Sequence, residues 1–354
     1  MTPFTYKAAG VDRDEQATFA ATIAAYRRRT FGPQVIEDPG GFAGLFAIYQ
    51  NGRLITPTYR RPVLVACAAG VGTKLKIAFL LNKHDTVGRD LVAMNVNSLL
   101  TIGATPLFFL DHIACGETTP AAKEQLVRGI ADGCAAAGCA LLDGETATMG
   151  DLYAKGEYDL AGFAVGMVER RRIIDRRRVQ PRDTIVGVAS SGLHSNGYTL
   201  VRRVLLDHAK MPLEGIVPDL GCPLGEELLR PTRLYVEALR VLRATYRYKH
   251  IPTGVAHVAE GGLLGSVCRA LPEGCRAELR RGAWPTPPIF QLVQKTGEIE
   301  EEEMLRTFNM GIGLALIVPP FFAGAIVRRL EKAGERAWVI GEVRRGARDA
   351  AIIS

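Results

Sequence analysis

An apolar segment that runs directly into a glycine-rich loop is the feature that most limits how this chain can fold. Residues 62–68 read Pro-Val-Leu-Val-Ala-Cys-Ala, the composition of a buried strand. The loop that follows is Gly70-Val71-Gly72-Thr73-Lys74. Glycine allows backbone N–H groups to converge on an anion, and lysine adds a positive charge. The sequence therefore predicts a strand that ends in a phosphate-binding loop.

Length and composition indicate a globular protein of two domains. The chain has 354 residues, of which 47% are hydrophobic and 23% charged, and a single core rarely extends over so many residues. The longest apolar stretch, 312–327, is interrupted by Pro319-Pro320, so we expect no membrane-spanning helix. The first residues lack the apolar core of a secretory signal, which favours a cytoplasmic location.

Cysteine usage and charge argue against further classes of protein. The seven cysteines are an odd number without CxxC spacing, which argues against a disulfide framework or a structural zinc site. The net charge is +7, but the arginine clusters 27–29, 170–172 and 176–178 are short and have few aromatic neighbours. Solvated basic faces or a site for a phosphorylated metabolite explain these clusters better than nucleic-acid binding does.

Strands and helices alternate in both halves of the chain, which is typical of an α+β or mixed α/β protein. We place the boundary in the basic segment Glu169–Arg178, giving domains 1–170 and 171–354. The predicted helices are 12–29, 88–103, 120–138, 198–208 and 263–270. The predicted strands are 62–68, 106–110, 140–142, 159–168, 184–189 and 313–318.

A series of motifs runs in order along nearly the whole chain. They are Ala9-Gly10-Val11-Asp12, Gly70 to Leu75, Asp85-Thr86-Val87-Gly88, Asp90 to Met94, Pro106 to Asp111, Gly144-Glu145-Thr146, Tyr158 to Phe163, Ser190 to Gly197, Pro231-Thr232-Arg233, Ala256-His257, Gly261-Gly262-Leu263 and Phe308 to Gly313. With these motifs the chain resembles the phosphoribosylformylglycinamidine cyclo-ligases, also called aminoimidazole ribonucleotide synthetases.

This resemblance implies a fold and a reaction. The fold would be two α+β domains, with the N-terminal sheets of two chains forming a β-barrel across a homodimer. The reaction would be the ATP-driven ring closure of formylglycinamidine ribonucleotide in purine synthesis. ATP would phosphorylate the formyl oxygen, because an amide oxygen is a poor leaving group, and a nitrogen of the same molecule would then attack. Correct folding of the bound substrate would supply much of the rate of this intramolecular step.

The resemblance also implies site residues. His194 is the best acid–base candidate, because an imidazole titrates near neutral pH and this one lies in a loop rich in hydroxyl groups. Asp111 and Glu145 lie within matching motifs and join it as catalytic candidates, and His257 is a weaker one. The residues expected to bind ATP or the nucleotide substrate are Gly70, Val71, Gly72, Thr73, Lys74, Asp90, Ser190, Ser195 and Asn196.

Departures from the family pattern gather at the expected metal site. The family has an aspartate directly before the glycine loop and another after Val-Asn, whereas this chain has Ala69 and Ser98. Those aspartates are the ones expected to hold Mg²⁺ on the ATP phosphates, so we expect a weakened or rearranged site. Asp111, Asp143 and Glu145 are the remaining candidates for the metal, since Mg²⁺ prefers oxygen ligands.

Three interpretations stay open at this point. The first is a working cyclo-ligase with a rearranged metal site. The second is a non-catalytic relative that keeps the phosphate loop and binds a phosphorylated ligand or regulates. The third is another member of the wider superfamily, such as a selenophosphate synthetase or a thiamine-phosphate kinase. No cysteine precedes Cys67, so an N-terminal redox nucleophile is absent, and the His-Ser-Asn-Gly loop favours the purine enzyme.

Overall fold

The computed structural model describes the chain except for residues 1–12, 37–42, 51–52, 55–58, 247–248 and 354. The chain forms two compact units, each of which is described by itself. Unit 1 comprises Met1–Val96 and Pro106–Glu169, and unit 2 comprises Asn97–Thr105 and Arg170–Ser354. The matching family motif Ala9 to Asp12 lies outside the described residues.

Unit 1 begins with a helix and several two-residue strands, and its main sheet follows. Its helices are α1 (Arg13–Arg28), the 3₁₀ turn η1 (Gly72–Lys74), α2 (Leu75–Leu81), α3 (Asp85–Thr101), whose last residues belong to unit 2, and α4 (Pro120–Ala137). Its strands are β1 (Val35–Ile36), β2 (Leu45–Phe46), β3 (Tyr49–Gln50), β4 (Arg53–Leu54), β5 (Pro62–Gly70), β6 (Thr105–Cys115), β7 (Ala140–Thr148) and β8 (Tyr158–Glu169).

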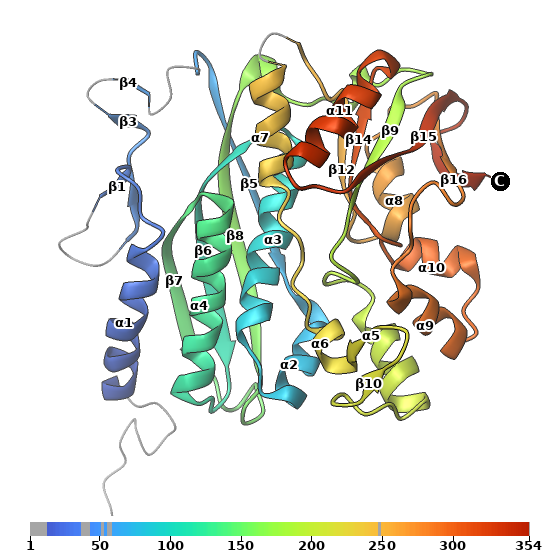
Figure 1. Ribbon diagram of the computed structural model, residues 1–354. Helices are drawn as coiled ribbons and strands as arrows, with labels where there is room; N and C mark the ends of the chain where they lie inside the picture. Colours follow the sequence, from blue (N-terminus) through green and yellow to red (C-terminus); the bar gives the residue numbers. More distant parts are fainter. Residues whose placement is uncertain (1–12, 37–42, 51–52, 55–58, 247–248, 354) are drawn as a thin grey trace, which may run out of the picture. The chain divides into compact units, whose positions relative to one another are not determined.

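The main sheet of unit 1 has the strand order β5-β8-β6-β7. Strands β5 and β8 pair antiparallel, whereas β6 and β7 pair parallel and are joined by α4, as a βαβ connection requires. Helices α3 and α4 lie side by side against one face of the sheet (Figure 1). They approach so closely that a Cβ on Gly129 would lie 1.9 Å from the Asp85 carbonyl oxygen, so only glycine fits there.

The opposite face of this sheet is apolar and carries exposed hydrophobic side chains. The side chains of β5 alternate, and Leu64 on the outward face is 63% exposed. Phe163 on β8 pairs with Ala68 of β5 on the same face and is 44% exposed. Phe46 packs on Phe108 beside them, with ring centroids 5.3 Å apart. An apolar face of this kind usually marks an interaction surface.

Unit 2 is built around a larger sheet. Its helices are η2 (Arg170–Arg172), η3 (Arg176–Arg178), α5 (Tyr198–Arg202), the π-helical η4 (Arg203–His208), α6 (Leu224–Leu228), α7 (Val236–Thr245), α8 (Gly262–Arg269), α9 (Pro288–Thr296), α10 (Glu301–Thr307) and α11 (Pro320–Lys332). Its strands are β9 (Thr184–Ala189), β10 (Ile216–Val217), β11 (Cys222–Pro223), β12 (Gly254–His257), β13 (Cys275–Arg280), β14 (Ile312–Val318), β15 (Ala337–Arg345) and β16 (Asp349–Ile353).

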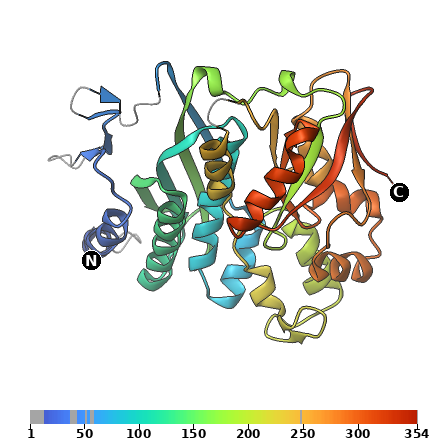
Figure 2. The same ribbon diagram turned by 45° about the horizontal axis from the view of Figure 1, so that its top comes forward.

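Six of these strands form one sheet in the order β12-β14-β9-β15-β13-β16. Helices α7 and α11 lie side by side on one face, as Figures 1 and 2 both show, and Leu239 and Ile326 from them join one core cluster. Helix α8 covers the other face, where Leu263 and Val267 join a second cluster with Ala256. The sheet is therefore buried on both sides, which explains why β14 is buried along its whole length.

Most of the predicted elements are confirmed, and three differ. The helix predicted over 120–138 is present as α4, which begins at Pro120 and is ended by Gly138 in the left-handed conformation. Strands β6 and β7 run well beyond the predicted 106–110 and 140–142, because their parallel pairing continues to Cys115 and Thr148. The helix predicted over 198–208 divides into α5 and a π-helical segment.

The apolar stretch over 312–327 contains β14 and the beginning of α11. Across the part of the chain that the structure describes, no helix is both long and apolar enough to cross a bilayer.

Candidate active site

The glycine loop follows strand β5, as predicted, although the strand continues to Gly70. Gly72 adopts φ 75°, a conformation that favours glycine, and begins the 3₁₀ turn η1. Gly72 and Thr73 are exposed, whereas Val71 and Lys74 on either side are buried. The exposed part of the loop is therefore at Gly72 and Thr73, and binding of a phosphate there stays a prediction.

Lys74 points into the interior of unit 1. Its ammonium Nζ lies 2.7 Å from Oδ2 of Asp90 on α3, and both side chains are fully buried. A buried pair of this kind is held firmly, because separating the two charges leaves at least one without compensation. The structure thus brings together two residues that were predicted to bind ATP. Their roles toward a phosphate stay predictions.

Ala69, which stands where the family pattern has an aspartate, lies on the helix-covered face of the sheet. It pairs with Gly162 of β8, and a Cβ on Gly162 would meet Asn95 and Leu91 of α3. The Ala69 carbonyl oxygen accepts a hydrogen bond of 3.1 Å from the Asn95 amide. In this chain position 69 therefore contributes a backbone acceptor that ties β5 to α3.

Asp111, Asp143 and Glu145 lie within strands β6 and β7. The predicted strands 106–110 and 140–142 place all three just beyond a strand end, and this is wrong. The parallel register of β6 and β7 places Asp111 beside Gly144 and His112 beside Glu145. Asp111 is 9% exposed, and burial raises its pKa to about 7, although Arg27 opposes the shift. Near neutral pH this carboxyl is therefore poised between its charged and neutral forms.

Two cavities meet at this group of acids within unit 1. One, of about 690 Å³, opens over the apolar sheet face beside Phe108 and Phe163. The other, of about 520 Å³, is lined by Phe19 and Arg27 of α1 and by Lys123 of α4. Asp111, Asp143, Gly144 and Glu145 line both cavities.

Asp143 is engaged by Arg27, whose guanidinium lies 3.1 Å from Oδ1 of Asp143 and also donates to the Leu142 carbonyl. Asp90 is engaged by Lys74. Among the residues that the structure describes, no three or more histidine, cysteine, aspartate or glutamate side chains form a group that could hold a metal ion. Mg²⁺ is usually held by one or two carboxylates together with substrate phosphates, so the assignment of Asp111, Asp143 and Glu145 as metal candidates stays a prediction.

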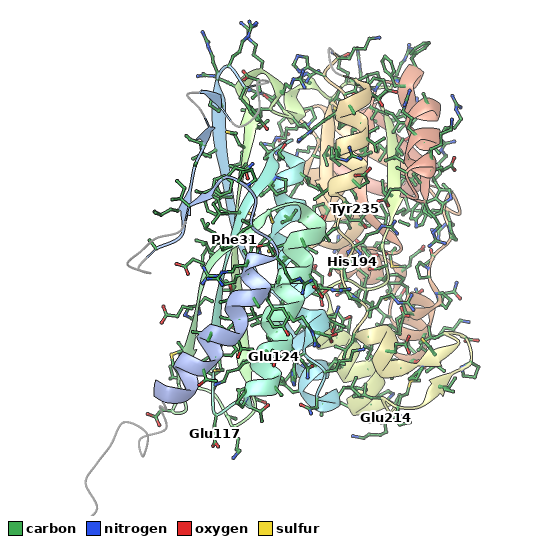
Figure 3. The ribbon with its side chains drawn as sticks, turned by 60° about the vertical axis from the view of Figure 1, so that its left-hand side comes forward. Phe31, Glu117, Glu124, His194, Glu214 and Tyr235 are labelled. Carbon is green, nitrogen blue, oxygen red and sulfur yellow. The ribbon has the colours of Figure 1, made fainter. Side chains whose placement is uncertain are left out.

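In unit 2 the loop after β9 holds His194 in an unusual conformation. His194 adopts φ 63°, which a residue with a side chain rarely does, and it is 2% exposed. Its Nε2 accepts a hydrogen bond of 3.2 Å from the Ser191 backbone N–H. Because Nε2 is the acceptor, a neutral ring carries its proton on Nδ1. The ring lies next to Tyr235, with centroids 6.3 Å apart, as Figure 3 shows.

The other predicted residues of this loop brace it in different ways. The Ser190 hydroxyl donates to the Gly192 carbonyl at 3.0 Å, and the Ser195 hydroxyl lies 3.0 Å from that of Thr232. The Asn196 Oδ1 atom is buried, with no hydrogen-bond partner among the described residues. Buried polar atoms usually have a partner, so this oxygen is a candidate contact for a bound ligand.

Sequence reasoning missed two residues that position His194. Asn309 donates hydrogen bonds to the carbonyls of Gly192 and Leu193 at 2.9 and 3.1 Å, which fix the backbone of the loop before His194. Tyr235 packs on His194 over Gly313, where a Cβ would lie 1.9 Å from the tyrosine hydroxyl. Asn309 stands in one of the family motifs, which was the available signal, whereas nothing in the sequence near Tyr235 indicates this contact.

Comparison with known proteins assigns both halves of the chain. The family of AIR synthase related proteins matches twice, its N-terminal domain over residues 55–168 and its C-terminal domain over 180–354. Among solved structures, thiamine-monophosphate kinase from Stenotrophomonas maltophilia has a TM-score of 0.68 at 19% identity and covers 94% of this chain and 95% of its own. Because the identity is low, this structural likeness shows the fold alone. The family matches define the class of the chain, which is an AIR synthase-like protein.

Curated relatives define the family more closely. The phosphoribosylformylglycinamidine cyclo-ligase of Geobacillus kaustophilus is 49% identical over 342 residues, covering 97% of this chain and 96% of its own. That of Syntrophotalea carbinolica is 48% identical over 345 residues, covering 98% of this chain and 96% of its own. The chain therefore belongs to the phosphoribosylformylglycinamidine cyclo-ligase family, the ATP-dependent ligases that make aminoimidazole ribonucleotide in purine biosynthesis.

Proposed function

We propose that the loops at 70–74 and 190–197 hold ATP and the ribonucleotide for the cyclo-ligase reaction. The reaction is the ATP-dependent ring closure that converts formylglycinamidine ribonucleotide to aminoimidazole ribonucleotide. The observation that carries this function is identity of 49% to a cyclo-ligase over 97% of the chain. The site residues named for it are our proposal, supported by their burial and contacts.

The glycine loop is proposed to bind the ATP phosphates through its backbone. Gly72 and Thr73 are exposed at the end of β5, and converging N–H groups are a common anion site. Lys74 is paired with Asp90 at 2.7 Å. We propose that this pair holds the loop in place and contributes an electrostatic field from the protein interior. Gly70 and Val71 complete the turn.

His194 is proposed to move the proton in the ring closure. Transfer of the γ-phosphoryl group to the formyl oxygen turns that oxygen into a phosphate leaving group. The attacking nitrogen then loses a proton while phosphate departs. An imidazole held by Ser191 and Tyr235 suits proton transfer near neutral pH. Ser190, Ser195 and Asn196 would bind the nucleotide substrate beside it.

Asp111 and Glu145 are proposed to act at the cavities of unit 1. Asp111 has its pKa raised to about 7 by burial, which allows it to give or take a proton at working pH. Glu145 is exposed on the neighbouring strand and lines both cavities. The Mg²⁺ dependence expected of an ATP-using ligase would then rest on the ATP phosphates more than on protein carboxylates.

A homodimer through the outward face of β5 and β8 is also proposed, with the domain boundary at 170/171. Its support is the exposed apolar face that carries Leu64 and Phe163. Leu64→Asp and Phe163→Asp should each shift the sedimentation coefficient from dimer to monomer. Leu80→Asp is the matched control, because Leu80 is equally exposed, at 63%, but lies on α2. Dimers that survive both sheet substitutions would contradict this interface.

Product formation tests the function directly. Purified protein would receive ATP, Mg²⁺ and formylglycinamidine ribonucleotide, and aminoimidazole ribonucleotide would be measured with time. We expect product in proportion to protein and to ATP consumed. No product above a blank without enzyme, even at high protein concentration, would overturn the catalytic function. Calorimetry with ATP and with the ribonucleotide would then show whether the chain is a binding relative.

A further inference from the structure

Position 98 lies beside a histidine. Ser98 is on the part of α3 that belongs to unit 2, and its hydroxyl lies 3.4 Å from Nδ1 of His257, 159 residues away along the chain. His257 ends β12 and is 7% exposed. The family pattern has an aspartate at position 98 that is expected to bind a metal, whereas the contact in this chain is with an imidazole.

The second ring nitrogen of His257 is a polar atom whose hydrogen bonding is not satisfied by the described residues. Its Nε2 is buried, with no hydrogen-bond partner among the residues that the structure describes. An unsatisfied buried polar atom is costly, and in native proteins it usually points to a water, a ligand or a catalytic role. His257 is followed directly by Val258, whose N–H donates to the Gly313 carbonyl, and by the turn that begins α8. Gly313 is also the residue over which Tyr235 and His194 pack.

The surroundings of His257 keep its ring uncharged. Across the sheet it faces Leu314 of β14, which is apolar, and α3 presents the neutral hydroxyl of Ser98. The charge that acts on it is the guanidinium of Arg269 on α8, and burial together with this charge lowers the pKa of His257 to about 4.

The 3₁₀ turn η3 also packs against β12 and carries the charged residues Arg176, Arg177 and Arg178. Arg176 donates to the Arg269 carbonyl, Arg178 to the His250 carbonyl, and Arg177 pairs with Asp175. These arginines add positive charge, so this turn also favours the neutral ring.

We propose that Ser98 is a positioning residue for His257, whose ring it orients through Nδ1 so that Nε2 is available to the bound ribonucleotide, and that position 98 is not a metal ligand in this chain. The proposal rests on the proposed function for the identity of the ligand. It assigns a second buried imidazole to the same unit as His194. An aspartate at this position would change that role, because a carboxylate beside the ring favours its imidazolium form.

Nitrogen NMR of histidine-labelled full-length protein tests this without turnover. His257→Asn identifies the resonances of His257. In the unsubstituted protein the ring should stay neutral from pH 5.5 to 8. In Ser98→Asp its pKa should rise by about one to three units, the effect of a carboxylate at contact distance, and 10 mM Mg²⁺ should leave that rise unchanged. Ser98→Asn, which adds no charge, should leave the ring neutral.

Thr245→Asp is a matched charge control, because the Thr245 hydroxyl contacts the Val241 carbonyl of its own helix. It should leave the pKa of His257 unchanged. An unchanged pKa in Ser98→Asp, or a rise that Mg²⁺ abolishes, would overturn the proposal. If Ser98→Asp does not fold, Ser98→Ala should alter the Nδ1 shift and Ser98→Thr should restore it. An unaltered Nδ1 chemical shift of His257 in Ser98→Ala would also overturn the proposal.

Adding formylglycinamidine ribonucleotide without ATP tests the second half of the proposal. Its binding should move the Nε2 resonance of His257, and a saturable change elsewhere with Nε2 unmoved would contradict the role given to that atom. Because none of these readouts needs catalysis, they separate this proposal from the proposed function. A protein that makes no product can still have the contact between Ser98 and His257, and an active enzyme can lack this contact.

Discussion

Four candidate site residues, two in each unit of this molecule, are held in different ways. In unit 1 the carboxylates near the glycine loop and β7 are engaged by cations, Asp90 by Lys74 and Asp143 by Arg27. In unit 2 the imidazoles of His194 and His257 lie against neutral groups, a backbone N–H and a hydroxyl. Asp90 and Asp143 of unit 1 are thus paired with cations, whereas the two imidazoles of unit 2 lie against neutral groups. Asp111 of unit 1 is the exception among these carboxyls, because burial raises its pKa to about 7.

This difference suggests a division of labour within the cyclo-ligase reaction. In the proposed site a phosphate would meet the exposed loop at Gly72 and Thr73 of unit 1, next to the buried Lys74–Asp90 pair. The ring closure needs a proton to leave a nitrogen, and groups of the kind found in unit 2 can accept one. Substitutions in unit 1 should therefore change stability and ATP binding first, whereas substitutions in unit 2 should change turnover first.

The largest effect is expected from His194→Asn. If His194 moves the proton, kcat should fall by roughly 10²- to 10⁴-fold, while the melting temperature changes little. His208→Asn is the matched control, because His208 is exposed at the end of η4 and should keep full activity. Steady-state kinetics with both substrates and a thermal melt give the two readouts. A His194→Asn enzyme with kcat within threefold of the parent would show that His194 does not move the proton. The functional difference proposed between the two units would then be lost.

Breaking the buried pair of unit 1 should cost stability. Lys74→Met leaves the Asp90 carboxylate buried without its cation, and such losses amount to about 3–5 kcal/mol. Asp90→Asn should cost a similar amount, and the double substitution should cost less than the sum of the two. Lys76→Met is the control, because Lys76 pairs with Glu157 at the surface, and exposed pairs contribute about 0–1 kcal/mol.

Urea unfolding followed by tryptophan fluorescence and by circular dichroism would measure these differences. If Lys74→Met proves as mild as Lys76→Met, the pair is not the fixed support that its burial indicates. The apparent affinity for ATP, measured by calorimetry on the folded variants, separates a loss of stability from a loss of phosphate binding.

Much of this arrangement could be read from the sequence because it depends on local signals. Pro120 and Gly138 mark the ends of α4 in the sequence, and the structure confirms both. The strand before the glycine loop was equally clear, since it is a continuous apolar run bounded by glycine. The ordered motifs indicated the family, and the comparisons confirm it.

The partners within the site could not be read in this way, because each pair joins distant residues. Nothing near Ser98 in the sequence points to His257, and nothing near Arg27 points to Asp143. The extents of β6 and β7 were underestimated for a related reason. Polar residues such as Asp111 and Glu145 end an apolar pattern, but backbone pairing between parallel strands does not depend on it.

A smaller, pH-dependent effect is expected from Asp111 in unit 1. Its pKa in the folded chain is about 7, against about 3.9 for an unfolded aspartate. The protonated form favours folding, so this contribution is fully present below about pH 4 and is lost as the pH rises through about 7. The stability of Asp111→Asn relative to the parent should therefore increase over that interval, by up to about 4 kcal/mol.

Urea unfolding of both proteins between pH 4 and 8 measures this difference. A constant difference across the interval would mean that Asp111 is ionised throughout. In that case unit 1 would carry one more buried charge than its cations balance, and the contrast with unit 2 would become sharper.

The smallest effect concerns the ion pair between α1 and β7. Arg27 and Asp143 are 28% and 40% exposed, and solvent screening limits such pairs to about 0.2–1 kcal/mol. A double-mutant cycle with Arg27→Gln and Asp143→Asn should give a coupling energy in that range. Arg27→Gln alone should cost more than Asp143→Asn alone, because Arg27 also donates to the Leu142 carbonyl. A coupling well above 2 kcal/mol would mean that Asp143 is held as firmly as Asp90, which would exclude it as a group that could turn toward a metal or a phosphate.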